Sequence, residues 1–412
     1  MTTVAVGVFD DLEALPGHPA AYFGPGARHR LPDLLGSAWP DRAAPVCGTR
    51  ARQVLLVRGR KSFERSGIAS VIARLVPGVR VEHLVVTAPN PTIDTVRHGV
   101  AVARRTDPDV VVGVGGGSAM DLAKMVAVLA SQPDDVARYL VDPVPLVARR
   151  PRLVLMPTTC GSGSELTQFA TVYVGHRKVS LDSGVARADL VLVDPELSAS
   201  VPPAVAAAAG ADALCQAIES YWAVSGSALS RAIAWESFEI AVAALHATVT
   251  AETSPPGGTI TADLARAAAL SGAAINLTRT TAAHALSYGL TGRLGLPHGL
   301  AVALHMRWLL KHNAAVSPGD CRHPAGAQTV AGYVADLEGT CLAATGGILS
   351  ALLERMLKAG GEPTGLADLA LDRAEWVGSW TDAVNSARAR NNPRLVTAED
   401  VHDASLKGGR DD

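Results

Sequence analysis

The sequence predicts an α/β domain built on a parallel sheet, followed by an all-helical domain. In the first half, short β-branched runs alternate with helix-like segments, which is typical of a parallel sheet covered by helices. From Pro202 onward the sequence becomes rich in alanine and shows no convincing strand pattern. With 412 residues the chain is long enough for two separate cores. We therefore expect an α/β domain over residues 1–195 and a helical domain over residues 196–412.

The apolar pattern predicts the elements of the first domain in order. The expected buried strands are Gln53–Val57, His83–Val86, Asp109–Val114, Arg152–Met156 and Ala188–Asp194. Ser62–Leu75 and Pro91–Arg104 are each predicted to be one crossover helix. Glu252–Gly258, rich in proline and glycine, is expected to be a loop between helices of the second domain.

Composition and charge exclude several classes of function. Hydrophobic residues make up 48% of the chain and charged residues 18%, so the chain can bury enough apolar surface to fold compactly. The formal net charge of −2 provides no overall field for nucleic acid or an anionic membrane. The start lacks the features of a secretory signal, and the later apolar runs are interrupted by charges. We expect a cytoplasmic protein, a homo-oligomer such as a dimer, with a small-molecule partner.

The cysteines favour reduced thiols. Their number is odd, they are scattered, and none forms a CxxC pair, which argues against a disulfide framework or a zinc cluster. Each is expected to be a small buried residue: Cys47, Cys160, Cys215, Cys321 and Cys341.

A glycine-rich turn follows the third expected strand and precedes a helix. Gly115, Gly116, Gly117 and Ser118 stand at this junction in DVVVGVGGGSAMDLAK. Glycines let backbone N–H groups approach a pyrophosphate, and the helix N-terminus adds partial positive charge. The spacing does not match the dinucleotide fingerprint GxGxxG. A purely structural tight turn is therefore the alternative.

The extended motif carries a resemblance. GGGSxxDxxK, with Asp121 and Lys124, is followed by PTTCGSGSE (Pro157–Glu165). Together they resemble the iron-activated, or group III, alcohol dehydrogenases, whose fold is shared with dehydroquinate synthase. The resemblance implies that the first domain binds a dinucleotide. The residues that it assigns to the nicotinamide cofactor are Gly115, Gly116, Gly117, Ser118, Asp121, Thr158, Thr159 and Ser162.

The choice of cofactor is indicated at the end of the expected strand Gln53–Val57. Many members of that family end this strand with an aspartate that binds the ribose hydroxyls, whereas this chain has Gly59, Arg60, Lys61 and Ser62. Without the carboxylate, a 2′-phosphate meets no repulsion and finds positive charge instead. We expect NADPH to be preferred, with NADH possible; the alternative is a solvated basic loop.

The second domain holds a candidate metal site. Asp212 and Gln216 are four residues apart and share one face of a helix. The resemblance implies a divalent ion bound by Asp212, His284 and His298, with Gln216 at a position where relatives have histidine. Two histidines and one carboxylate commonly hold Fe²⁺, while Zn²⁺ and Mn²⁺ are alternatives.

Tyr288 is one turn beyond His284, where many relatives carry another histidine. Its hydroxyl could donate a hydrogen bond during catalysis, but an ordinary tyrosine pKa makes it a poor proton relay at neutral pH. A packing role is the alternative.

The substrate is expected to be an anionic aldehyde. Arg279, flanked by threonines in INLTRTTAAH, suits a phosphate or phosphonate group, and Lys178 is a second candidate. The stretches DALCQAIESYW, NLTRTT and HALSYGLTGRLGLPHG resemble the phosphonoacetaldehyde reductases, a branch of the family in phosphonate antibiotic pathways that forms 2-hydroxyethylphosphonate. Alternatively, Arg279 pairs with Glu219 or Asp212.

Three further functions are open. The first is a general metal-dependent dehydrogenase acting on uncharged small alcohols and aldehydes. The second is a lyase of the dehydroquinate synthase type, although the region from Asp212 to His298 contains no lysine for its polar site. The third is a nicotinamide-binding regulatory or scaffold protein that lost its metal through the change at Gln216.

Overall fold

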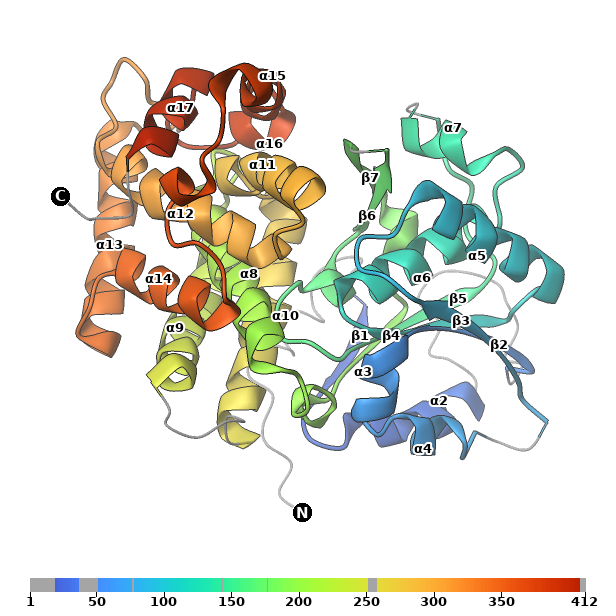
Figure 1. Cartoon of the computed structure of the whole chain (residues 1–412). Coiled ribbons are helices and arrows are strands. Elements are labelled where there is room, and N and C mark those ends of the chain that lie inside the picture. Colours follow the sequence, from blue (N-terminus) through green and yellow to red (C-terminus); the bar gives the residue numbers. More distant parts are fainter. Residues whose placement is uncertain are drawn as a thin grey trace. The chain divides into compact units, whose positions relative to one another are not determined.

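A computed structural model of the chain describes residues 19–36, 51–75, 78–141, 144–175, 177–250 and 258–407. Cys47 and most of the expected loop Glu252–Gly258 lie outside these residues. The chain forms two compact units (Figure 1). The first comprises Met1–Thr159 and Ser164–Val201, and the second comprises Cys160–Gly163 and Pro202–Asp412. The expected boundary between residues 195 and 196, drawn as a single cut between two domains, stays a prediction.

The first unit is built on a parallel six-stranded sheet with the order β1-β8-β5-β4-β2-β3. Its strands are β1 (Ala20–Phe23), β2 (Gln53–Gly59), β3 (Arg80–Val86), β4 (Val110–Gly115), β5 (Arg152–Pro157) and β8 (Leu190–Val193). All five predicted strands are present. The short edge strand β1 was not predicted, because four half-buried residues give little periodic signal.

Helices cover the sheet on both faces, as its continuous apolar strands require (Figure 1). On one face, alternate strand residues such as Val54 and Leu56 pack with α2 (Leu31–Gly36), α3 (Arg60–Arg65) and α4 (Ala69–Ile72). The helices α5 (Ile93–Thr106) and α6 (Gly117–Leu129) pack together on the other face, and α7 (Val136–Val141) follows them.

The single helix predicted over Ser62–Leu75 is wrong. The chain forms α3 and α4 instead, and Gly67 between them has a φ of +73°. This left-handed conformation interrupts the helix and is one that glycine adopts without steric cost. The hairpin of β6 (Phe169–Val174) and β7 (Arg177–Asp182) was also not predicted; it is antiparallel and separate from the main sheet.

The second unit is mostly helical in the part that the structure describes, which confirms the predicted helical domain. Its elements are α8 (Pro203–Trp222), α9 (Ala228–Thr250), α10 (Gly258–Thr278), α11 (Ala282–Gly289), α12 (His298–Ala314), α13 (Ala327–Thr345), α14 (Leu349–Gly360), α15 (Arg373–Val384), α16 (Ala387–Arg390) and α17 (Ala398–Leu406). The central helix α8 packs against α9, α10, α12 and α14. Within the described residues, α9 alone is long and apolar enough to cross a membrane, a property it shares with core helices, and it packs against α8 and α10.

Three glycines of this unit lie in close contact with the backbone of a neighbouring helix. A Cβ on Gly163 would lie 2.4 Å from the Cα of Gly272 in α10, and one on Gly161 would lie 2.4 Å from the carbonyl oxygen of Ala209 in α8. The segment Cys160–Gly163 therefore packs directly on the helices, and we call it the strap. A Cβ on Gly299 would lie 2.0 Å from the carbonyl oxygen of Ala208, so the start of α12 also lies against α8.

Candidate active site

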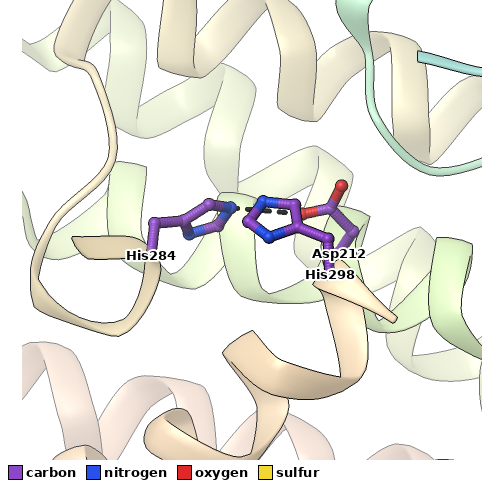
Figure 2. Close-up of side chains that lie close together, drawn as sticks. All are labelled: Asp212, His284 and His298. Atoms are coloured by element: carbon purple, nitrogen blue, oxygen red, sulfur yellow. Dashed lines mark hydrogen bonds and ion pairs between the residues drawn. The ribbon is translucent and has the colours of Figure 1, made fainter. Parts of the chain in front are cut away.

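Three predicted metal ligands converge in the helical unit. Asp212 on α8, His284 on α11 and His298 at the start of α12 have ligand atoms within 4.8 Å of one another (Figure 2). Nε2 of His284 lies 3.1 Å from Oδ1 of Asp212. Asp212 and His284 are buried and His298 is partly buried. The resemblance implied this set, and the structure places the three side chains around one point.

The helix boundaries explain this convergence. Helix α10 ends directly before Arg279, whose φ of +66° is unusual for a residue other than glycine. Helix α11 then begins at Ala282. A π-helical turn at Leu290–Leu294 and Gly295, with a φ of +75°, lead into α12. The contact of Gly299 with α8 then brings His298, one residue earlier, beside Asp212. The two histidines are thus positioned by helix starts and Asp212 by a helix interior.

Glu219 supports this site from behind His284. It lies seven residues after Asp212 on α8 and is fully buried. One carboxylate oxygen accepts hydrogen bonds from the amide of Thr281 at 3.1 Å, its hydroxyl at 2.7 Å and the amide of His284 at 3.3 Å. The other oxygen makes a short contact with Nδ1 of His284. Glu219 therefore does not pair with Arg279, so this half of the alternative is wrong, whereas a pair between Arg279 and Asp212 stays a prediction.

The carboxylate of Glu219 determines which ring nitrogen of His284 carries the proton. Burial opposes charge on both groups, but their mutual attraction and hydrogen bonds lower the pKa of Glu219 and raise that of His284. A proton on Nδ1 donated to Glu219 leaves Nε2 as an acceptor directed at Asp212. Two acceptors 3.1 Å apart repel each other unless a cation or a proton lies between them. The residues present therefore fit a divalent ion, and a histidine oriented by a carboxylate is a common arrangement around such ions.

Gln216 lies on the same face of α8, one turn after Asp212. Its Nε2 donates to the carbonyl oxygen of Ser162 at 3.3 Å, and its Oε1 accepts from the hydroxyl of Ser271 at 2.9 Å. The amide thus ties the strap to α10. A carbonyl oxygen has a second lone pair, so coordination of a metal by Gln216 stays a prediction, as does a contact of Ser162 with the cofactor.

Tyr288 stacks on His298, with ring centroids 6.0 Å apart and an interplanar angle of 29°. Burial raises the pKa of its hydroxyl, which keeps the group protonated at neutral pH. The observed contact agrees with packing. A catalytic role for Tyr288 stays a prediction.

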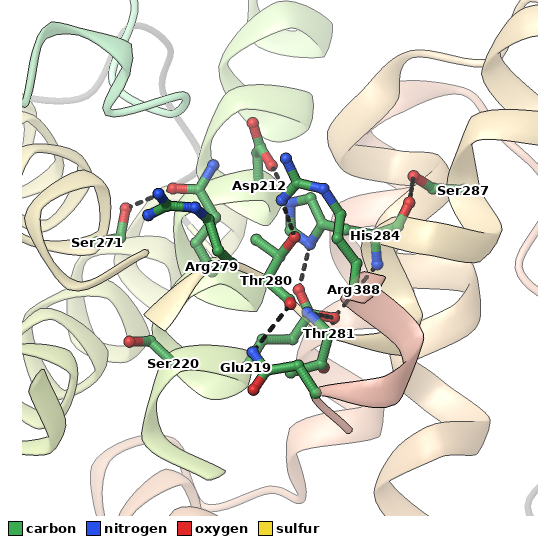
Figure 3. A network of polar contacts seen from close by, with 12 residues as sticks. Asp212, Glu219, Ser220, Ser271, Arg279, Thr280, Thr281, His284, Ser287 and Arg388 are labelled. Atoms are coloured by element: carbon green, nitrogen blue, oxygen red, sulfur yellow. Dashed lines mark hydrogen bonds and ion pairs between the residues drawn. The ribbon is translucent and has the colours of Figure 1, made fainter. Parts of the chain in front are cut away.

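Arg279 and Arg388 flank the loop that leads to His284 (Figure 3). Arg279 is partly buried and donates to the carbonyl oxygen of Asn276. Arg388 comes from α16 and donates to the hydroxyl of Thr280 at 2.7 Å. Arg388 was not predicted from the sequence, because 108 residues separate it from Thr280 and no local pattern links them. Lys178 lies on β7 in the other unit, and its role in binding substrate stays a prediction.

The glycine turn of the first unit lies at the carboxyl ends of adjacent strands. Gly115 ends β4 with a φ of +155° and accepts a hydrogen bond from the amide of Thr158, which follows β5. A Cβ on Gly115 would lie 3.4 Å from the nitrogen of Gly59, and one on Gly116 would lie 3.3 Å from Oγ1 of Thr159. Side chains would therefore fill the space above this turn, which glycine leaves open.

One buried hydroxyl at this turn indicates a ligand. Oγ1 of Thr158 is buried and makes no hydrogen bond within the described part of the chain. A buried polar group normally has a partner, and a phosphate oxygen would supply one. Gly117 begins the long helix α6, whose N-terminus favours the same anion. The residues present fit the pyrophosphate of a dinucleotide.

The residues around this turn differ in their contacts. Arg60 and Lys61 begin α3 and are exposed, and the hydroxyl of Ser62 lies over Gly59. Ser118 accepts a hydrogen bond from the amide of Asn90. Their contacts with the cofactor stay predictions.

Asp121 and Lys124 are buried and bond to the protein. Asp121 accepts hydrogen bonds from the hydroxyl of Ser164 at 2.6 Å and from the amide and hydroxyl of Thr171 at 2.9 and 2.7 Å. Lys124 donates to Ser164, Thr167 and the carbonyl oxygen of Phe169. These contacts position the chain after β5. A contact between Asp121 and the cofactor stays a prediction.

A parallel sheet with a phosphate-type turn, and a helical unit with two histidines and a carboxylate, define a metal-dependent dehydrogenase of two units. Residues 19–195 match the family model of iron-containing alcohol dehydrogenase, and residues 206–406 match that of the C-terminal region of the Fe-containing alcohol dehydrogenase family. The chain belongs to the iron-containing alcohol dehydrogenase family. It is accordingly an oxidoreductase that uses a nicotinamide cofactor and a divalent metal.

The chain is similar to several known members. It is 35% identical over 338 residues to a phosphonoacetaldehyde reductase of Streptomyces viridochromogenes, covering 80% of this chain and 84% of the relative. It is 26% identical to an NADPH-dependent butanol dehydrogenase of Clostridium saccharobutylicum, covering 72% and 73% of the two chains. In structure it resembles the sulfoacetaldehyde reductase of Bifidobacterium kashiwanohense in complex with NAD⁺, with a TM-score of 0.74, 24% identity, and 96% and 98% of the chains covered. This last likeness confirms the fold.

Proposed function

We propose that this enzyme reduces phosphonoacetaldehyde to 2-hydroxyethylphosphonate with NADPH, in a pathway of phosphonate natural products. The observation that carries the proposal is the position of Arg279, which directly precedes the two threonines leading to the metal ligand His284. Here a guanidinium group suits the phosphonate of a two-carbon aldehyde whose carbonyl would face the metal ligands. The similarity to the Streptomyces reductase supports the same substrate.

The chain's own residues prepare the reduction. When bound, the metal supplies a Lewis acid for the carbonyl oxygen, and the nicotinamide supplies the hydride for the carbonyl carbon. Asp212, His284 and His298 would hold the ion, and Glu219 keeps His284 in the ligating tautomer. A proton from solvent or a nearby hydroxyl completes the alcohol. Tyr288 remains protonated and supports the ring of His298 by stacking.

We further propose NADPH as the preferred cofactor. Gly59 replaces the carboxylate that would repel a 2′-phosphate, and the exposed Arg60 and Lys61 follow it directly. Relatives use either cofactor, since one carries NADPH in its name and another was crystallised with NAD⁺.

A substrate panel tests the proposal. The purified enzyme is assayed anaerobically with phosphonoacetaldehyde, sulfoacetaldehyde and propanal, each with NADPH and NADH and with added Fe²⁺, Zn²⁺ or Mn²⁺. We expect the highest kcat/KM for phosphonoacetaldehyde with NADPH, and a loss of activity on chelation. Equal kcat/KM for propanal and phosphonoacetaldehyde would instead favour a general alcohol dehydrogenase.

A lyase and a scaffold protein fit the molecule less well. Membership in the family favours oxidoreduction over the lyase reaction, and the convergence of Asp212, His284 and His298 favours an enzyme over a scaffold protein. We also propose a cytoplasmic homodimer, for which light scattering of the purified enzyme and cell fractionation are the direct tests.

A further inference from the structure

We propose that Arg388 is a second guanidinium group that binds the anionic end of the substrate, opposite Arg279. The inference rests on the proposed function and deepens it, because it explains how the enzyme would select a doubly charged phosphonate. Three observations carry it: how Arg388 is fixed, what it faces, and how the charges around it balance.

The loop that carries Arg279 fixes Arg388. Its guanidinium donates to the hydroxyl of Thr280, one residue after Arg279. Asn391, three residues after Arg388, donates to the carbonyl oxygens of Thr278 and Thr280 at 2.9 and 3.3 Å. The short segment of α16 is thus tied to this loop on both sides of Arg279. Such restraints reduce the entropy that an arginine would lose on binding a ligand.

Arg388 faces the candidate metal site. Figure 3 shows its side chain extending from α16 toward Asp212 and His284. The helix α16, which carries Arg388, packs against α11, which carries His284 and Tyr288. Tyr288 in turn stacks on His298. Arg388 therefore approaches the ligands from the side of α11 and α16.

The formal charges around the site sum to +2 when a divalent ion is bound. Among the residues labelled in Figure 3, the carboxylates are Asp212 and Glu219, and the guanidinium groups are Arg279 and Arg388. The carboxylates contribute −2 and the guanidinium groups +2, so a divalent ion with neutral histidines brings the total to +2. This total matches the charge of roughly −2 that a phosphonate carries near neutral pH, by analogy with a phosphate monoester. A sulfonate, with one charge, matches less well.

A guanidinium group has five N–H donors, so Arg388 can hold Thr280 and an oxyanion together. An arginine that merely braces the loop would make only the first contact. The variant Thr280→Val separates the roles, because it removes the acceptor hydroxyl and retains the guanidinium.

The test compares Arg388→Gln, Arg388→Lys and Thr280→Val with Arg390→Gln, an exposed arginine of the same helix, as the matched control. KM is measured for phosphonoacetaldehyde, sulfoacetaldehyde and propanal. Binding of methylphosphonate, which cannot be reduced, is measured by calorimetry on the metal-loaded protein. We expect Arg388→Gln to raise KM for phosphonoacetaldehyde and the Kd of methylphosphonate about 10- to 100-fold, with a smaller rise for sulfoacetaldehyde and little change for propanal. Arg388→Lys should fall between the wild type and Arg388→Gln.

Two results would overturn the inference: equal rises in KM for propanal and phosphonoacetaldehyde without weaker binding of methylphosphonate, or a full reproduction of the effect by Thr280→Val. A wild-type enzyme without preference for anionic aldehydes would instead contradict the proposed function. The binding of methylphosphonate would still decide the role of Arg388 in that case.

Discussion

Replacing Glu219 by glutamine tests how the metal ligands are held. The substitution retains the volume of the side chain, and its amide oxygen can still accept the hydrogen bonds of Thr281. Its NH₂ group, however, would face the Nδ1–H of His284, where the wild type has a carboxylate oxygen. Two donors repel each other, so His284 would move its proton to Nε2, the atom that faces Asp212. In that form Nε2 cannot bind a metal.

The expected loss is about 10- to 100-fold in metal affinity, or about 1.4 to 2.8 kcal/mol. We expect the upper end, because Glu219 is fully buried and water cannot replace it. Competition between the apoprotein and a chromogenic chelator for Zn²⁺ measures the Kd directly. Glu239→Gln, at an exposed position of the neighbouring helix α9, is the control. A variant with a wild-type Kd and an unchanged Tm would refute the reasoning, whereas a lower Tm of the apoprotein alone would identify Glu219 as a stabilising residue only.

Three further predictions concern the nucleotide turn, a buried acid and the fourth ligand position. Replacing Arg60 and Lys61 by alanine should lower the ratio of kcat/KM for NADPH over NADH about tenfold; an unchanged ratio would contradict the phosphate contact. Glu165→Gln should abolish a fall in the free energy of unfolding between pH 4.5 and 7, measured by urea titration; a parallel pH dependence in both proteins would be the contrary result. Gln216→His should tighten Zn²⁺ binding about tenfold in the chelator competition, because it adds a histidine ligand. Weaker binding would show that the hydrogen bond from Gln216 to the strap contributes more to the site than an added ligand does.

The sign of the effect at Glu165 follows from its burial, which raises its pKa from 4.5 to about 7. Above pH 4.5 the unfolded chain releases this proton while the folded protein retains it, so rising pH favours unfolding until about pH 7. The loss is on the order of 3 kcal/mol. Burial lowers the pKa of the neighbouring Lys124 to about 8, and this group adds stability only as the pH rises above that value.

The sheet could be predicted from the sequence because strands buried on both faces form continuous apolar runs, such as Val110–Val114. The turn at Gly115 could be predicted because it interrupts such a run directly before a helix. The break at Gly67 could not, since an isolated glycine within an apolar pattern is compatible with a helix. The hairpin of β6 and β7 escaped prediction because neither strand keeps a regular alternation of buried and exposed positions along its length.

The residues of the candidate site also divide into those that the sequence indicated and those that it did not. The resemblance indicated Asp212, His284 and His298, and the spacing of Asp212 and Gln216 placed these two on one helix face. The role of Glu219 depends on the chain returning at Thr281 and His284, more than 60 residues later. The position of Arg388 depends on a contact across 108 residues. Neither arrangement leaves a local pattern.

The strap has a consequence for engineering. The chain leaves the first unit after Thr159, returns at Ser164 and leaves again after Val201, so neither unit is one uninterrupted stretch. A chimera joined near residue 195 would bring a foreign strap to the native helices, where Gly161 and Gly163 leave no room for a methyl group. When the nucleotide-binding unit is exchanged between relatives, residues 160–163 should therefore come from the same protein as the helices.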